Sequence, residues 1–163
     1  MRLYAVMVFL HVLSVVIWVG GMFLMHFAVR PVAVAQLPPA QRLPLLGDIL
    51  GRFFGWVTLA VLVVLATGVA MIVGIGAAAG TGAFSEGLRL AHPSVHLMFA
   101  IGLVMSLVFV FIRLAPFVRM RSALGAQQLP DAAAHLDLIR RLVATNLVLG
   151  IVTIGLATVG RAL

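Results

Sequence analysis

The stretch Leu3–Val29 reads LYAVMVFLHVLSVVIWVGGMFLMHFAV and holds no charged residue between Arg2 and Arg30. A helix needs about 20 apolar residues to cross a bilayer, so this stretch predicts a membrane span. It nevertheless contains a histidine, His11. An ionisable side chain at membrane depth is costly unless it faces the interior of a helix bundle and has a partner there. The partner of His11 is therefore the first question that the sequence raises.

The composition is that of an integral membrane protein. Of 163 residues, 64% are hydrophobic and 9% are charged, which lies outside the range of soluble domains. The absence of cysteine excludes disulfides, iron–sulfur clusters and thiolate metal sites, and leaves the five His and eight Met as soft ligands. The basic residues are all arginines at the ends of apolar runs. This placement favours lipid headgroups over nucleic acid as their partner.

The pattern of apolar runs predicts one all-α domain over residues 1–163, an integral membrane four-helix bundle with up-down-up-down topology. A glycine-rich segment at 74–82 is expected to end the second span. A short interfacial helix at about 131–139, with Asp131 as its N-cap, is expected before the fourth span. The four spans are predicted at about 3–29, 53–73, 93–113 and 141–160.

The arginines predict the orientation of the bundle. Eight of the eleven lie in the connections 30–52 and 113–141. Because positive residues are enriched on the cytoplasmic side, both connections are expected there. We therefore expect a multi-pass protein of the bacterial inner (cytoplasmic) membrane with both termini periplasmic.

Two segments of the sequence suggest an internal repeat. His11–Pro31 and His96–Pro116 each span 21 residues, and each has an Arg close to its closing proline. If the repeat holds, the bundle consists of two parallel two-span halves, related by an axis along the membrane normal. In straight helices the equal spacing places His11 and His96 at about the same depth.

The two histidines each have a second soft ligand one turn away. Met7 precedes His11 and His92 precedes His96, in both cases by four residues, which places each pair on one helix face. Met7, His11, His92 and His96 thus form a candidate metal site, and copper is a metal that such ligands suit. His11 and His96 alone could instead be the axial ligands of a haem b. In a third alternative, the histidines only bridge helices of a structural membrane subunit without a cofactor.

Several motifs resemble a known family. They are LHVLSVVIWVGGMF followed by Arg30-Pro31, Arg52-Phe-Phe-Gly-Trp56, Ala66-Thr-Gly68 and Arg113-Leu-Ala-Pro116. Together they resemble the copper-resistance D (CopD) family of bacterial inner-membrane proteins. The resemblance implies copper handling, by binding, transport or delivery, with His and Met as ligands.

A weaker similarity is to the HemJ-type four-span proteins, which are linked to haem. Those proteins are expected to carry a Lys soon after the histidine of the third helix, where this chain has Met98. The similarity thus supports haem binding more than porphyrin oxidation. No hydrolytic triad, phosphate-binding glycine loop or paired carboxylates occur, so no catalytic residues are predicted. A non-enzymatic role is favoured, and the enzymatic alternative is a membrane haem oxidoreductase.

The predicted partners follow from these hypotheses. They are the lipid bilayer and copper or haem. A periplasmic metal-delivery protein, a redox partner and a homo-oligomer are compatible with the sequence.

Overall fold

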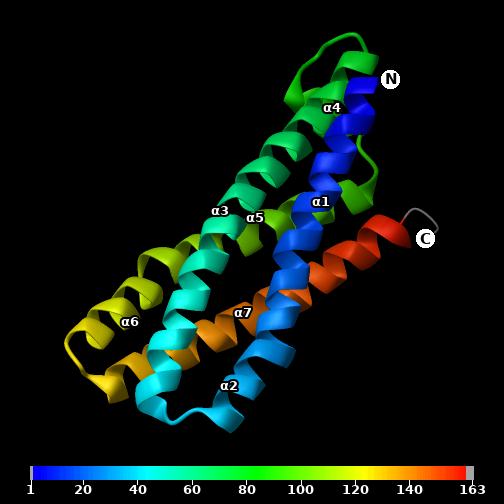
Figure 1. The fold of residues 1–163 in the computed structure, drawn as a ribbon. Coiled ribbons are helices and arrows are strands. Elements are labelled where there is room, and N and C mark those ends of the chain that lie inside the picture. The colour runs from blue at the N-terminus through cyan, green and yellow to red at the C-terminus, as the bar shows by residue number, and fades with distance from the viewer. Residues whose placement is uncertain (1, 161–163) are drawn as a thin grey trace.

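The computed structural model describes residues 2–160, and all regular secondary structure in that range is helical (Figure 1). Four helical runs are long and apolar enough to cross a membrane. The predicted all-α membrane four-helix bundle is therefore confirmed. The elements are α1 (Arg2–Leu24), the π-helical turn η1 (Met25–Val29), α2 (Arg30–Gln36), α3 (Pro39–Ala78), α4 (Phe84–Leu90), α5 (Pro93–Leu114), α6 (Pro116–Gly125) and α7 (Leu129–Thr158).

The long helices pack as two hairpins. One hairpin pairs α1 with α3, and the other pairs α5 and α6 with α7. In Figure 1 the α1–α3 pair runs steeply, whereas α7 crosses it at a shallower slope. The hairpins meet where α7 contacts α1 and α3 and where α3 contacts α5 and α6, while α1 and α5 share few contacts among the described residues. The first and third spans are therefore diagonal to each other, as an up-down-up-down bundle requires.

Aromatic side chains form the centre of the bundle where the hairpins cross. The ring of Phe109 lies 6.3 Å from that of Trp18 and 5.8 Å from that of Phe54, in edge-to-face contacts that bring α1, α3 and α5 together. Large apolar side chains elsewhere point outward, such as Phe9 and Leu107, which are 62% and 69% exposed. In a bilayer these outward faces lie against lipid.

The helix α3 is much longer than the expected span of 53–73. Its 40 residues correspond to about 60 Å at 1.5 Å per residue, twice the hydrocarbon thickness. The segment before residue 53 is helical because its apolar residues recur every three or four positions, and Leu43, Leu46 and Leu50 are all buried. The sequence predicted a connection over 30–52, between the first two spans. Pro39 stands in the first turn of α3, where a proline is tolerated, whereas Pro44 lies inside the helix.

The helix α7 is continuous from Leu129 to Thr158, so the expected short helix at 131–139 is its first part. Gln128, not Asp131, occupies the N-cap position. No helix-breaking residue separates the two parts, and the carboxylate of Asp137 bonds Arg140 and Arg141 across the expected boundary. Such i,i+3 and i,i+4 ion pairs support a helix rather than interrupt it.

The first helix of each hairpin is interrupted next to a proline. Before Pro31, the chain widens into η1, where the N–H of Arg30 bonds the carbonyl of Met25, five residues back. Before Pro116, the helix breaks at Ala115, whose φ and ψ are −114° and −81°. A proline ring clashes with the carbonyl four residues earlier, which explains both interruptions. The two 21-residue segments thus end in comparable breaks, while the repeat itself stays a prediction.

Candidate functional site

The polar partner of His11 in the structure is a threonine of the neighbouring helix. The imidazole of His11, on α1, places Nδ1 2.9 Å from the hydroxyl oxygen of Thr67, on α3. Thr67 is buried and His11 is half-buried. The contact joins the two helices of the first hairpin, and it is the polar partner that a histidine at membrane depth needs.

The hydrogen bonds of Thr67 assign the tautomer of His11. The Thr67 hydroxyl lies 2.6 Å from the carbonyl oxygen of Val63, to which it donates. A hydroxyl has one proton, so Thr67 can only accept a hydrogen bond from His11. The ring proton of His11 therefore lies on Nδ1. This assignment leaves the lone pair of Nε2 for a ligand, the arrangement typical of metal-binding histidines.

A glycine next to Thr67 leaves room for the imidazole. A Cβ atom added to Gly68 would lie 3.5 Å from Cε1 of His11, in ordinary contact, so a larger side chain would press on the ring. Neither Thr67 nor Gly68 was predicted as a site residue. Their signal was present as the Ala66-Thr-Gly68 motif, but the sequence does not show which face of the second span meets His11.

The histidines of α5 make local hydrogen bonds at its N-terminal end. His92 is the N-cap, and its Nδ1 accepts a hydrogen bond from the backbone N–H of Ser94 at 3.3 Å. Its ring proton therefore lies on Nε2. Nδ1 of His96 lies 3.3 Å from the carbonyl oxygen of His92, which can only accept. His96 thus carries its proton on Nδ1 and, like His11, has a free lone pair on Nε2.

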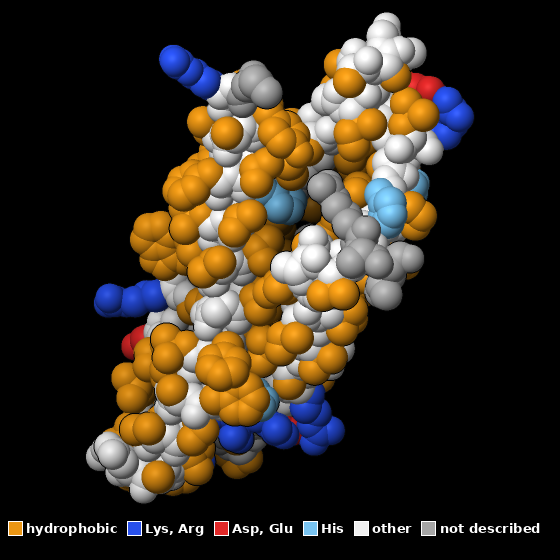
Figure 2. Space-filling view, turned by 90° about the vertical axis from the view of Figure 1, so that its right-hand side faces the viewer, with side chains coloured by type: hydrophobic (Ala, Val, Ile, Leu, Met, Phe, Trp, Pro, Cys, Tyr) orange, Lys and Arg blue, Asp and Glu red, His pale blue; other side chains and the backbone are white. Residues whose placement is uncertain are grey.

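The four predicted ligands do not converge in the structure. Met7 lies half-buried one turn from His11 on α1, whereas His92 and His96 are exposed on α5. In the upper half of the view in Figure 2, histidine side chains (pale blue) appear at two separate places. Across residues 2–160, no three His, Asp or Glu side chains lie close enough together to hold a metal ion. A joint site of Met7, His11, His92 and His96 stays a prediction.

A family comparison places most of the chain among known proteins. The family model described as copper resistance protein D matches residues 47–159. The match includes Thr67, Gly68 and the histidines of α5, and it begins after Met7 and His11. Comparison with curated proteins found no match, and comparison with solved structures found none. The weaker similarity to HemJ-type proteins stays a prediction.

The length of the match and the four apolar helices lead to the same conclusion. The matched segment covers more than half of the 163 residues and extends from the first half of α3 to the end of α7. The four candidate spans agree with a multi-pass membrane protein. The chain therefore belongs to the copper resistance protein D family.

Proposed function

We propose that this protein handles copper within the membrane, by binding, transport or delivery, with His11 as the central ligand. The family supports a role in copper resistance. The observation that carries the proposal further is the hydrogen bond from His11 to Thr67, which fixes the ring and leaves Nε2 free. The same bond would satisfy a structural histidine, so the family match and the free nitrogen together support the proposal. A ligand also needs a free lone pair, and His11 has one.

The chemistry of the outer half of the bundle suits copper. In the absence of thiolates, imidazole nitrogens and thioether sulfurs are the ligands that copper accepts. His11 and His96 each offer Nε2, and Met7 offers a thioether one turn away from His11. His92 joins this set only when its ring proton moves or its cap is released, because Nδ1 holds the Ser94 N–H. A shared ion would bring the outer end of α5 toward α1.

The test is a Cu(I) titration of the detergent-purified protein against a chromophoric chelator. Wild type is compared with His11→Ala and His96→Ala, and His135→Ala, at the start of α7, is the matched control. We expect both test variants to lose affinity by at least about tenfold and the control to bind like wild type. Unchanged affinity in both test variants would refute the proposal. Circular dichroism verifies that each variant keeps its helix content.

The haem b alternative rests on the same two nitrogens, because axial ligation by two histidines also requires free Nε2 atoms on diagonal helices. An absorption spectrum of protein from haem-replete cells separates the alternatives. A Soret band that both histidine substitutions abolish would favour haem. The structural-subunit alternative predicts that these substitutions lower the melting temperature and leave the binding of copper and haem unchanged.

A further inference from the structure

A cleft lies at the arginine-rich end of the bundle, far along α1 from His11. It is bounded by η1 and α2, by the first part of α3 and by the first part of α7. One chamber of about 220 Å³ is lined by Arg30, Arg42 and Asp137 among apolar side chains. A second chamber is lined by Met25, His26 and Arg140. Arg30, Leu46 and Leu136 line both chambers, so the chambers are adjacent, and we refer to them together as the cleft.

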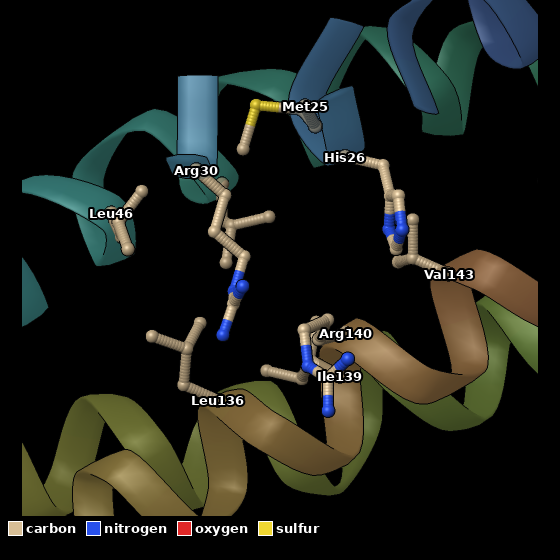
Figure 3. Close-up of a pocket in the computed structure, with 9 residues that line it drawn as sticks. Met25, His26, Arg30, Leu46, Leu136, Ile139, Arg140 and Val143 are labelled. Carbon is tan, nitrogen blue, oxygen red and sulfur yellow. The ribbon is translucent and has the colours of Figure 1, made fainter. Parts of the chain in front are cut away.

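The π-helical turn positions the side chains at the junction of the two chambers. Figure 3 shows the guanidinium of Arg30, the first residue of α2 directly after this turn, extending into the cleft and that of Arg140 rising from α7. His26, within the turn η1, points toward Val143. A π-helical turn inserts one extra residue and reorients the side chains that follow it, which is why such turns often occur at functional sites.

The cleft has more positive than negative charge. Arg30, Arg42 and Arg140 line it and are all half-buried. The one carboxylate among its lining residues, Asp137, is already bonded to Arg140 at 2.6 Å and to Arg141 at 2.8 Å. Among residues 2–160, neither Arg30 nor Arg42 forms a salt bridge. Arg30 is repelled by Arg140 and Arg42, and the attraction to Asp137 offsets only part of this repulsion.

Half-buried cations that repel one another favour the binding of an anion beside them. The guanidinium group forms paired hydrogen bonds with phosphate oxygens, so the arginines of the cleft suit a phosphate group. The second chamber adds apolar walls from Met25, Leu50 and Val143 directly beside these charges. A ligand that satisfies both chambers is an amphiphile with a phosphate at one end.

We propose that this cleft binds the headgroup of one anionic phospholipid. The phosphodiester lies between Arg30 and Arg42, and an acyl chain runs along the apolar second chamber toward Val143. Basic pockets between membrane helices on the cytoplasmic side are suited to anionic headgroups. Free phosphate would satisfy the charges, but it would leave the apolar chamber unused. The inference does not depend on copper binding.

Native mass spectrometry of the detergent-purified protein tests this site. Wild type is titrated with phosphatidylglycerol and, separately, with phosphatidylcholine. We expect phosphatidylglycerol to bind with one preferred site and phosphatidylcholine to bind more weakly. Inorganic phosphate in millimolar excess should not displace the bound phosphatidylglycerol. Displacement by phosphate alone would mean that the cleft is a site for a free anion, and the lipid proposal would be wrong.

Matched variants assign the binding to the cleft. Arg30→Gln and Arg42→Gln are each expected to weaken phosphatidylglycerol binding about fivefold, as expected for one arginine near an anionic membrane surface. Arg119→Gln is the control, because Arg119 is exposed on α6 outside the cleft and the change in charge is the same. Equal weakening in the control would overturn the proposal. Arg30→Lys keeps the charge but loses paired hydrogen bonding, so its affinity for phosphatidylglycerol should fall between those of wild type and Arg30→Gln. Circular dichroism verifies that each variant is folded.

Discussion

The imidazole of His11 is oriented by a single hydroxyl group, that of Thr67. Replacing Thr67 by Val removes this acceptor and keeps a similar shape. We expect copper affinity to fall about 10- to 100-fold, the usual effect of losing a group that orients a metal-binding histidine. Thr67→Ser should restore most of the affinity because it keeps the hydroxyl. The measurement is the same Cu(I) competition titration.

Thr153→Val provides the matched control for this substitution. The Thr153 hydroxyl bonds only the carbonyl of Leu149, in its own helix. Its loss should leave copper affinity unchanged. If Thr153→Val weakened copper binding as much as Thr67→Val, the effect would come from a general change in the bundle.

The space beside the His11 ring is provided by Gly68. Gly68→Ala should bind copper like wild type, because its Cβ would lie at an ordinary contact distance of 3.5 Å from Cε1. Gly68→Leu should push the ring away from Thr67 and weaken copper binding by at least about tenfold. The control is Gly74→Leu on the same helix, where a Cβ would meet no atom within 4 Å. Comparable loss in Gly74→Leu would contradict this account.

At the scale of the helices, α7 approaches α1 closely at Gly150. A Cβ atom there would lie 2.8 Å from Cγ2 of Val19 and 3.3 Å from Cε of Met105. Val19 is β-branched and cannot easily move aside. Gly150→Ala should therefore destabilise the protein by about 1–3 kcal/mol, as overpacking does, and lower its melting temperature in detergent.

Gly155 gives the control for this contact. It lies on the same helix, and a Cβ there would meet nothing within 4 Å. Gly155→Ala should leave the melting temperature unchanged or raise it slightly, because alanine favours helix over glycine. Equal destabilisation by both substitutions would mean that Gly150 is not a point of close packing between helices.

The existence of the four long helices could be predicted, because span length and hydropathy depend only on local composition. Their full extents could not. Whether the segment 39–52 is helical depends on burial of Leu43, Leu46 and Leu50, and that burial depends on contacts with distant parts of the chain. Likewise, a short helix at 131–139 and a fourth span from 141 were both expected. The ion pairs of Asp137 with Arg140 and Arg141 support one continuous helix across the boundary between them.

The candidate site was predictable only in part, for a similar reason. The depth of His11 implied a polar partner, and equal spacing suggested His96. The structure instead provides Thr67, which packs against His11 because the first and second spans form a hairpin. Likewise, the arginines were recognised as markers of orientation. Their convergence at a cleft depends on the turn before Pro31 and on the crossing of α7, which a linear pattern does not show.

At the scale of the whole molecule, the charge distribution predicts the orientation in the membrane. The chain contains no cysteine, so a single introduced cysteine reports one position. Thr81→Cys, in the turn between α3 and α4, should react with a membrane-impermeant thiol reagent in intact cells. Gln127→Cys, between α6 and α7, should react only after lysis. The opposite pattern would invert the proposed topology and place His11 in the cytoplasmic half.

The central claim is that His11 donates its Nδ1 proton to Thr67 and binds copper through Nε2. Nitrogen-15 NMR of histidine-labelled protein, recorded before and after addition of Cu(I), tests it most directly. The His11 signals are assigned by their loss in His11→Ala. We predict the Nδ1–H tautomer in the copper-free protein and a copper-dependent shift of the His11 Nε2 resonance. An Nε2–H tautomer without copper, or unchanged His11 resonances with copper bound, would contradict the claim.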